Sequence, residues 1–275
     1  MSLMRERTQF EARRFLESVG DVFAIFDART QDSGNVSFGV RVDTKRFFVK
    51  TAGDPSVTGA LLDHAGRIAV LENAIAFAQS VRHPALPRLL NVIASATGPM
   101  LVYEWVHGDL VRVPAQLRAD PSSAFQRFRA QPLYDLLTAL EAIIEVHVRS
   151  SGKGWVACDF YDGSIIYDFE RKEVHLVDLD HYHRGPFTNA MGRMLGSTRF
   201  MAPEEFVRGA LVDETTTTYV LGRMLSVFVG DGTLERSAFR GSDPLHALML
   251  RACATDRALR FQTVAELAQR WRAVR

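Results

Sequence analysis

The segment that decides the fold is residues 196–204, which read Gly-Ser-Thr-Arg-Phe-Met-Ala-Pro-Glu. Proline is favoured in the first turn of a helix, so we expect Pro203 to open one. Glu204 lies in that turn, and an arginine near the C-terminus, Arg260, is the candidate partner for its carboxylate. The chemistry of this segment is therefore structural, because it ties a central loop to the end of the chain.

The overall composition is that of an ordinary globular protein. The chain has 275 residues, 47% of them hydrophobic, with 33 Lys+Arg against 32 Asp+Glu. This balanced charge argues against a nucleic-acid partner, because phosphate contacts need clustered Lys and Arg. No run of about 18 apolar residues is present, so no membrane span is expected. The N-terminus lacks the apolar core of a signal peptide, and the two cysteines are too few for a disulfide framework. We therefore expect a cytoplasmic protein.

The first third of the chain has the pattern of a small sheet with helices. Apolar residues at helical spacing predict a short amphipathic helix within residues 8–19. Turn residues between apolar runs predict three antiparallel strands, and two further strands follow later in this part of the chain. A stretch rich in Ala, Leu and Ile without proline predicts one long helix at residues 59–81. The predicted strands are residues 22–28, 36–42, 46–50, 89–94 and 99–104.

After Gly108 the sequence is mainly helical. Short strands are predicted around a loop at residues 155–158, 164–167 and 173–177, and helices are predicted at 132–148, 215–229, 244–254 and 263–273. A β-rich first third before an α-rich remainder indicates an α+β fold of two lobes with a hinge near Glu104–Gly108. The predicted organisation is an N-terminal helical extension at residues 1–20, a first lobe at 21–106 and a second at 107–275.

Three places along the chain carry candidate chemistry. Lys50 lies on a predicted strand with bulky apolar neighbours at alternate positions, so its ammonium points to one face of a sheet. It is either a phosphate-binding or carboxylate-binding lysine or a solvated lysine on an edge strand. Asp178 and Asp180 follow an apolar strand, and two carboxylates at a strand end suit Mg²⁺, although an Asp-rich turn is the plainer interpretation. Asp159 lies on a loop and could accept a proton from an attacking hydroxyl.

The order of these parts resembles that of the eukaryotic-type protein kinases over about Val22–Trp271. The most specific match is residues 196–204, where kinases carry Gly-Thr-x-x-Tyr-x-Ala-Pro-Glu and this chain has Ser197 in the threonine position. Residues 82–90 look like the segment after the family's C-helix. Residues 256–261 look like the late motif whose arginine pairs with the Ala-Pro-Glu glutamate. The resemblance implies a bilobal fold with a small β-rich lobe containing one long helix and a larger, mainly helical lobe.

The resemblance assigns the cofactor-binding residues of the first lobe, with ATP as cofactor. Lys50 would hold the α- and β-phosphates and pair with a glutamate of the C-helix. Glu72 is the candidate, although it lies about half a turn further from the following motif than the family pattern has it. Backbone groups of Glu104 and Val106 would meet the adenine, with Tyr103 in the gatekeeper position.

In the second lobe, the resemblance assigns Asp178 to the Mg²⁺ that bridges the β- and γ-phosphates, and Asp159 to the acceptor hydroxyl. Asp178 is followed by Leu179 and Asp180 in place of the usual Phe-Gly. This Asp-x-Asp form is similar to that of the aminoglycoside and choline kinases, in which the second acid also binds metal. Asp180 is therefore a further metal candidate.

Several positions depart from the kinase pattern. The phosphate loop, residues 32–37, keeps a single glycine, Gly34, with Ser33 and Asn35 as its candidate hydrogen-bond donors. The His-Arg-Asp triplet is Ala-Cys-Asp at 157–159, so the arginine that reads a phosphorylated loop is missing. The catalytic-loop lysine and asparagine and the buried aspartate of a later helix are also replaced. Tyr161, Ser164 and Thr217 occupy those positions, and Asp162 is the candidate for the missing metal carboxylate.

These residues favour one function and leave two alternatives. The first is an ATP- and Mg²⁺-dependent Ser/Thr protein kinase, since residues 196–204 shape the peptide platform of that family. The second is a small-molecule kinase of the aminoglycoside or choline type, suggested by the Asp-x-Asp motif. The third is a pseudokinase that binds nucleotide or acts as a scaffold, suggested by the altered catalytic loop. In the first two the acceptor is a protein or a small-molecule hydroxyl.

Overall fold

The computed structural model describes residues 2–29 and 33–275, and the chain forms two compact units. The first unit runs to Ser80 and includes Pro87–Val106, whereas the second comprises Val81–Leu86 and His107–Arg275. Helices and antiparallel strands occur together, so the fold belongs to the α+β class. Within the described residues, none of the helices combines the length and the apolar character needed to cross a membrane.

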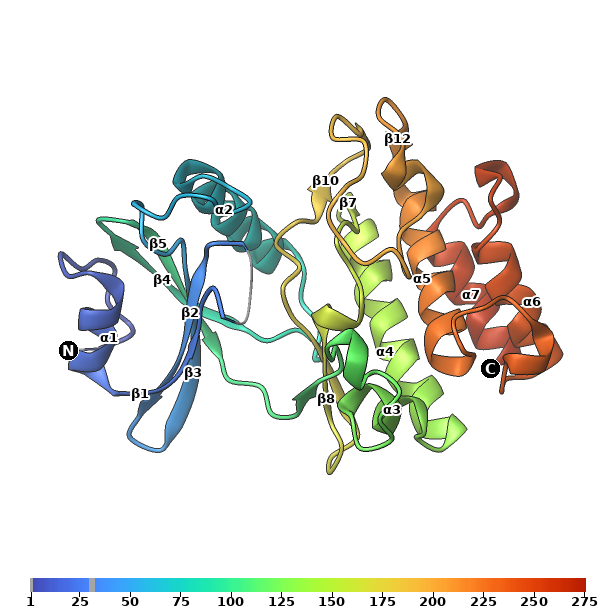
Figure 1. Cartoon of the computed structure of the whole chain (residues 1–275), viewed down its shortest axis with the longest axis horizontal. Helices are drawn as coiled ribbons and strands as arrows, with labels where there is room; N and C mark the ends of the chain where they lie inside the picture. The colour runs from blue at the N-terminus through green and yellow to red at the C-terminus, as the bar shows by residue number, and fades with distance from the viewer. Residues whose placement is uncertain (1, 30–32) are drawn as a thin grey trace. The chain divides into compact units, whose positions relative to one another are not determined.

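A five-stranded antiparallel sheet forms the centre of the first unit (Figure 1). The first three strands form the predicted meander, and the last two add to it in the order β1-β2-β3-β5-β4. β3 is therefore the central strand. The strands are β1 (Asp21–Phe26), β2 (Val36–Val42), β3 (Lys45–Thr51), β4 (Leu89–Ser95) and β5 (Gly98–Glu104).

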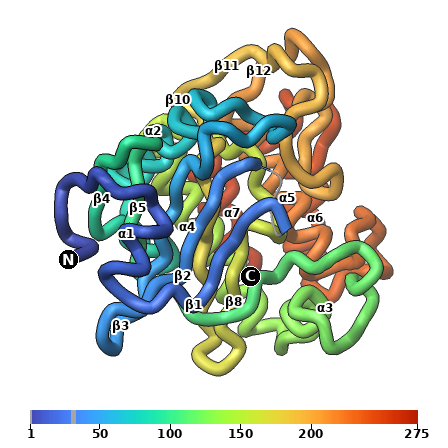
Figure 2. Tube along the Cα trace, turned by 60° about the vertical axis from the view of Figure 1, so that its left-hand side comes forward, coloured from blue at the N-terminus to red at the C-terminus, as the bar shows by residue number. Residues whose placement is uncertain are grey.

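The N-terminal segment completes the hydrophobic core on one face of this sheet. α1 (Ala12–Val19) buries Phe15 and Leu16 completely against strand residues such as Val49. The residues before α1 run beside β4, as Figure 2 shows, and the Asn91 side chain donates hydrogen bonds to two of their carbonyls. Residues 2–19 are thus part of the first unit, because they supply four of the ten buried side chains in this core cluster.

The long helix α2 (His64–Ser80) covers the opposite face of the sheet (Figure 1). It begins five residues later than the sequence pattern predicts. Asp63 caps it, since its Oδ1 accepts a hydrogen bond of 2.8 Å from the backbone N–H of Gly66. Gly59 has a φ of +80°, which a helix does not allow. The apolar composition of residues 59–62 therefore does not extend the helix.

The second unit is mainly helical with short strand pairs. α5 packs against α4, α6 and α7, and almost all of its residues are buried. Three antiparallel groups of strands lie with these helices, in the orders β6-β8-β9, β10-β7 and β11-β12. The helices are α3 (Ala124–Arg129), α4 (Leu133–Ser151), α5 (Glu214–Val229), α6 (Asp243–Ala252) and α7 (Val264–Val274). The strands are β6 (Asp109–Leu110), β7 (Trp155–Val156), β8 (Ile165–Asp168), β9 (Glu173–Leu176), β10 (His183–Arg184), β11 (Phe187–Thr188) and β12 (Leu211–Val212). Short 3₁₀ helices lie at Ala115–Leu117, Asp162–Ser164, Pro203–Phe206, Arg236–Ala238 and Arg257–Leu259.

Candidate active site

Lys50 is a buried cation on the central strand of the first unit. It pairs with Ser37 on β2 and with Leu101 on β5, which belongs to the apolar cluster beneath α2. Directly paired residues point to the same face of a sheet, so Lys50 lies on the face that α2 covers. Its exposed fraction is only 7%. This position excludes the alternative of a solvated lysine on an edge strand.

The candidate phosphate loop begins with Asp32, which lies outside the described residues, and continues through Ser33, Gly34 and Asn35. Gly34 has a φ of +81°, and a Cβ there would lie 2.7 Å from Nη1 of Arg67. Both the backbone angle and the lack of space therefore require glycine at this position. The N–H of Asn35 donates a hydrogen bond of 3.3 Å to Oγ of Ser33.

The helix α2 does not place an acid on its buried side. Its buried residues are Arg67, Leu71, Ala74 and Phe77, whereas Glu72 is solvent-exposed. The prediction that Glu72 faces the Lys50 ammonium therefore does not match the rotation of the helix. Successive side chains of a helix point in different directions, so the buried Leu71 leaves the adjacent Glu72 on the solvent side.

The candidate hinge residues lie at the end of β5. The carboxylate of Glu104 is held by Arg88, whose backbone N–H and Nε donate to it at 3.0 and 2.8 Å. The N–H of Glu104 also donates to the carbonyl of Arg88. Tyr103 packs in the cluster beneath α2, and Val106 is the last residue of the first unit. The Glu104 side chain is therefore engaged within the first unit, and the role of these backbone groups in adenine binding stays a prediction.

In the second unit, Asp159 and Asp178 have unusual backbone angles. Four non-glycine residues have positive φ in the described part of the chain, and two of them, Asp43 and Lys172, lie in turns between paired strands. The other two are Asp159 at 58° and Asp178 at 59°, and neither lies in such a turn. Strained backbone outside turns is concentrated at functional sites. Asp159 and Asp178, the two acids singled out from the sequence, are thus the two described non-glycine residues with positive φ outside such turns.

The loops that carry these acids are joined through Ser164. The N–H of Val177, next to Asp178, donates to the carbonyl of Ser164 at 3.0 Å. The N–H of Ser164 donates in turn to the carbonyl of Tyr161, also at 3.0 Å. The antiparallel pairing of β8 with β9 begins immediately afterwards. This set of backbone bonds holds the 159–164 loop beside the segment that begins at Asp178.

Tyr161, in the catalytic-loop lysine position, is surrounded by the site's carboxylates. Burial is the main cause that raises the pKa of Tyr161 to about 12, and three carboxylates act in the same direction: those of Asp159, Asp178 and Asp162. Arg112 lies over the ring, with its guanidinium carbon 5.8 Å from the ring centre. The phenol is therefore protonated and uncharged at neutral pH.

Asp162 has a different partner from the predicted metal. Its buried carboxylate forms an ion pair with Arg199 through one oxygen, while its Oδ1 has no hydrogen-bond partner in the described part of the chain. Ser164 is fully buried as well. The described residues contain no group of three or more His, Cys, Asp or Glu side chains that could hold a metal. Asp178 and Asp180 still suit Mg²⁺, which commonly takes one or two protein carboxylates with substrate phosphates and water.

The loop around Asp159 is bonded to Thr217 and lies beside Gly196, both in the second unit. Thr217, which replaces the buried aspartate of the kinase pattern, is itself buried, and its Oγ1 accepts a hydrogen bond of 3.0 Å from the N–H of Ala157. Gly196 has a φ of +124°, and a Cβ there would lie 3.5 Å from Oδ1 of Asp159. The beginning of the 196–204 segment therefore runs directly past the Asp159 carboxylate.

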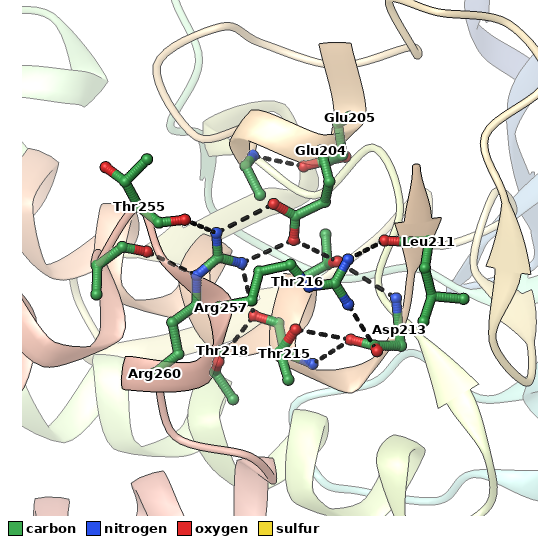
Figure 3. A network of polar contacts seen from close by, with 12 residues as sticks. Glu204, Glu205, Leu211, Asp213, Thr215, Thr216, Thr218, Thr255, Arg257 and Arg260 are labelled. Atoms are coloured by element: carbon green, nitrogen blue, oxygen red, sulfur yellow. Dashed lines mark hydrogen bonds and ion pairs between the residues drawn. The ribbon is translucent and has the colours of Figure 1, made fainter. Parts of the chain in front are cut away.

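The end of the same segment is tied to the C-terminal part of the chain by the Glu204–Arg260 ion pair (Figure 3). Arg260 is fully buried and donates to both carboxylate oxygens, at 2.7 and 3.0 Å. Thr216 donates to the same carboxylate, and the Nε of Arg260 donates to the carbonyl of Ala254. Burial alone would raise the pKa of Glu204, but the hydrogen bonds from Arg260 and Thr216 hold it below its ordinary value.

The pKa of the neighbouring Glu205 is shifted in the opposite direction to that of Glu204. Its carboxylate is buried and accepts a hydrogen bond of 2.6 Å from the N–H of Ala202. Burial, with the charges of Glu204 and Asp159, raises the pKa of Glu205 to about 8. Glu205 is therefore mostly protonated at pH 7. It directly follows the 196–204 segment.

His147 is a positioning residue that the sequence pattern does not reveal. Its Nδ1–H donates to the carbonyl of Ile143 at 2.8 Å, and its Nε2 accepts from the hydroxyl of Tyr182 at 2.7 Å. Complete burial lowers the pKa of His147 to about 4, so it is neutral and can accept. Tyr182 follows Asp180 by two residues, so this bond ties the Asp-x-Asp segment to α4. The helical period marks His147 as a core residue but does not show its partner.

Comparison with protein-family models gives no match to this chain, and comparison with curated proteins gives none either.

Proposed function

We propose that this chain is an ATP- and Mg²⁺-dependent phosphotransferase with the bilobal architecture of the protein kinases. The observation that carries the proposal is the pair of strained acids, Asp159 and Asp178, on neighbouring loops of the second unit. Positive φ at an aspartate costs stability, and both acids occupy positions that the kinase pattern reserves for catalysis. The buried Lys50 on the central strand of the first unit supplies the third element of that pattern.

In this proposal each residue has a separate task. Asp159 orients the acceptor hydroxyl and takes its proton, since its carboxylate lies beside Gly196 at the entrance of the peptide-platform segment. Asp178 and Asp180 would hold Mg²⁺, which neutralises charge on the phosphates when bound. Lys50 binds the α- and β-phosphates, and backbone groups at Glu104 and Val106 bind adenine. The acceptor is a Ser or Thr hydroxyl of a protein, favoured by the 196–204 segment.

A second candidate function, a nucleotide-binding module without turnover, is favoured by the charges of the catalytic loop. One oxygen of Asp162 is taken up by Arg199, and Tyr161 is an uncharged phenol at the position where the kinase pattern has a cation. Catalysis of phosphoryl transfer depends mostly on such charges. The small-molecule kinase, suggested by the Asp-x-Asp motif, differs from the protein kinase only in its acceptor. The acceptor of the phosphate separates the three functions. The protein kinase labels a protein, the small-molecule kinase labels a sugar, an aminoglycoside or choline, and the nucleotide-binding module labels neither.

The nucleotide part of the proposal predicts Mg²⁺-dependent ATP binding that requires Asp178. We expect Asp178→Asn to weaken Mg·ATP binding by about tenfold or more, because a charged ligand contact is worth roughly 1.5–3 kcal/mol. Binding of ATP in EDTA should change much less. Isothermal titration calorimetry measures both affinities. Asp243→Asn, which alters a highly exposed carboxylate of the same unit, is the matched control and should bind as wild type does. Equal loss with and without Mg²⁺ would contradict the metal role.

A further inference from the structure

Arg67 is a buried cation whose guanidinium donates to backbone carbonyls and to none of the carboxylates among the described residues. It lies in the first turn of α2 and is fully buried. Its Nη1 donates to the carbonyl of Gly34 at 2.5 Å and its Nη2 to the carbonyl of Asp54 at 3.0 Å. Its Nε–H is buried and has no acceptor among residues 2–29 and 33–275, and the Asp54 carboxylate accepts hydrogen bonds from Ser56. Burial of a guanidinium against two neutral carbonyls is costly, so a purely structural role would be better filled by an apolar side chain.

The Gly34 carbonyl that accepts from Arg67 is closely surrounded by other backbone atoms. A Cβ on Gly53, whose φ is +72°, would lie 2.5 Å from the Gly34 oxygen. Thr51 fixes this region further, because its Oγ1 donates to the carbonyl of Val36 at 2.7 Å and accepts from the N–H of Gly53 at 3.2 Å. Gly34 itself admits no side chain, as described above. Three elements of the first unit thus define a single position for the Gly34–Asn35 peptide.

We propose that Arg67 is a positioning residue for nucleotide phosphates, acting through the Ser33–Asn35 segment. The Gly34–Asn35 peptide is trans and planar, so its C=O and N–H point in opposite directions. Because the carbonyl of Gly34 points toward Arg67, the N–H of Asn35 points away from Arg67. There it lies beside the Ser33 hydroxyl, to which it donates at 3.3 Å. The Ser33 hydroxyl accepts this bond and keeps its own hydrogen, which is the donor that a phosphate oxygen would meet. The loop has a single glycine in place of three. Arg67 therefore fixes the backbone conformation of this loop through the Gly34 carbonyl.

This inference rests on the proposed function, and its test uses ligands that differ only in phosphate. We expect Arg67→Met in the full chain to weaken Mg·ATP and ADP binding by about tenfold, the effect of losing one charge-assisted contact. Adenosine binding should be unchanged, because adenosine presents no phosphate. Arg67→Lys should lie between, since an ammonium reaches one of the two carbonyls. Arg41→Met removes the same charge from an exposed ion pair on β2 and should bind every ligand as wild type does.

Gly53→Ala tests the same carbonyl without altering Arg67. Its Cβ should displace the Gly34 oxygen, so it should also lower ATP and ADP affinity and spare adenosine. The double variant Arg67→Met/Gly53→Ala should lose little more than either single change. If Arg67→Met does not fold by circular dichroism, Arg67→Lys and Gly53→Ala carry the comparison.

The outcomes that overturn the inference are distinct from those that overturn the proposed function. Equal loss of adenosine and ATP affinity in these variants would show a general structural role for Arg67, and unchanged ATP affinity would show no role at all. Either result leaves wild-type ATP binding intact. A wild-type chain that binds neither ATP nor ADP would instead overturn the proposed function, and this inference with it.

Discussion

Replacing Arg260 by methionine should lower the free energy of unfolding by about 3–5 kcal/mol. The guanidinium is fully buried and donates to both oxygens of Glu204, whose carboxylate is 5% exposed. Removal of one member of a buried pair leaves the other charge without compensation, and this is the source of the large cost. Urea unfolding followed by circular dichroism measures the change.

The control for Arg260 is a second arginine–carboxylate pair of the same unit. The side chains of Arg236 and Asp243 are 47% and 85% exposed, so Arg236→Met should cost less than about 1 kcal/mol. Glu204→Gln should also be strongly destabilising, and the double variant Glu204→Gln/Arg260→Met should cost less than the sum of the single changes. An Arg260→Met chain as stable as wild type would show that the pair does not anchor the 196–204 segment.

Glu205 should make the chain less stable as the pH rises from about 4.5 to about 8. Burial is the main cause that raises the pKa of Glu205 from 4.5 to about 8 in the folded chain. Between these values the unfolded chain has released the proton while the folded chain keeps it, so stability falls with pH. The full difference of about 3.5 pH units corresponds to about 4–5 kcal/mol. It is present below pH 4.5 and lost above pH 8.

Glu205→Gln should remove this pH dependence, because the amide keeps an oxygen for the N–H of Ala202 and cannot ionise. Urea unfolding at pH 5, 6.5 and 8.5 compares the variant with wild type, and the difference between the two curves isolates Glu205. Glu235→Gln alters an exposed acid of the same unit and should leave the slope unchanged. A wild-type slope that survives Glu205→Gln would refute the protonated state of this side chain.

Local sequence signals predict the elements of the fold well but not all of their ends. The strands of the five-stranded sheet lie within about two residues of their predicted bounds, because turn residues separate the apolar runs. The start of α2 is different, since Asp63 caps the helix after residues whose apolar character alone favours helix. The short helix α3 lies in the polar stretch 112–129, where Ser123 caps it and Phe125 and Phe128 are buried.

The candidate site is predictable as a set of positions and not as a set of contacts. Pattern and order single out Asp159 and Asp178, whose strained backbone appears only in the structure. The partners of Asp162 and Arg67 depend on residues 37 and 33 positions away along the chain. The periodicity of apolar residues within a helix or strand does not predict pairs so far apart in the sequence. Glu72 shows the converse error, because the sequence supplies an acid near the expected position and the helix turns it to solvent.

The central claim, phosphoryl transfer to a hydroxyl, is tested most directly with γ-labelled ATP, Mg²⁺ and the purified chain, alone, with generic protein substrates, and with small alcohols. Wild type should label a Ser- or Thr-containing protein acceptor. Asp159→Asn should lower that rate by at least about a hundredfold, the usual contribution of a general base, while binding Mg·ATP with wild-type affinity. An Asp159→Asn chain that transfers phosphate at the wild-type rate, or a wild-type chain that binds Mg·ATP and labels no acceptor, would contradict the claim.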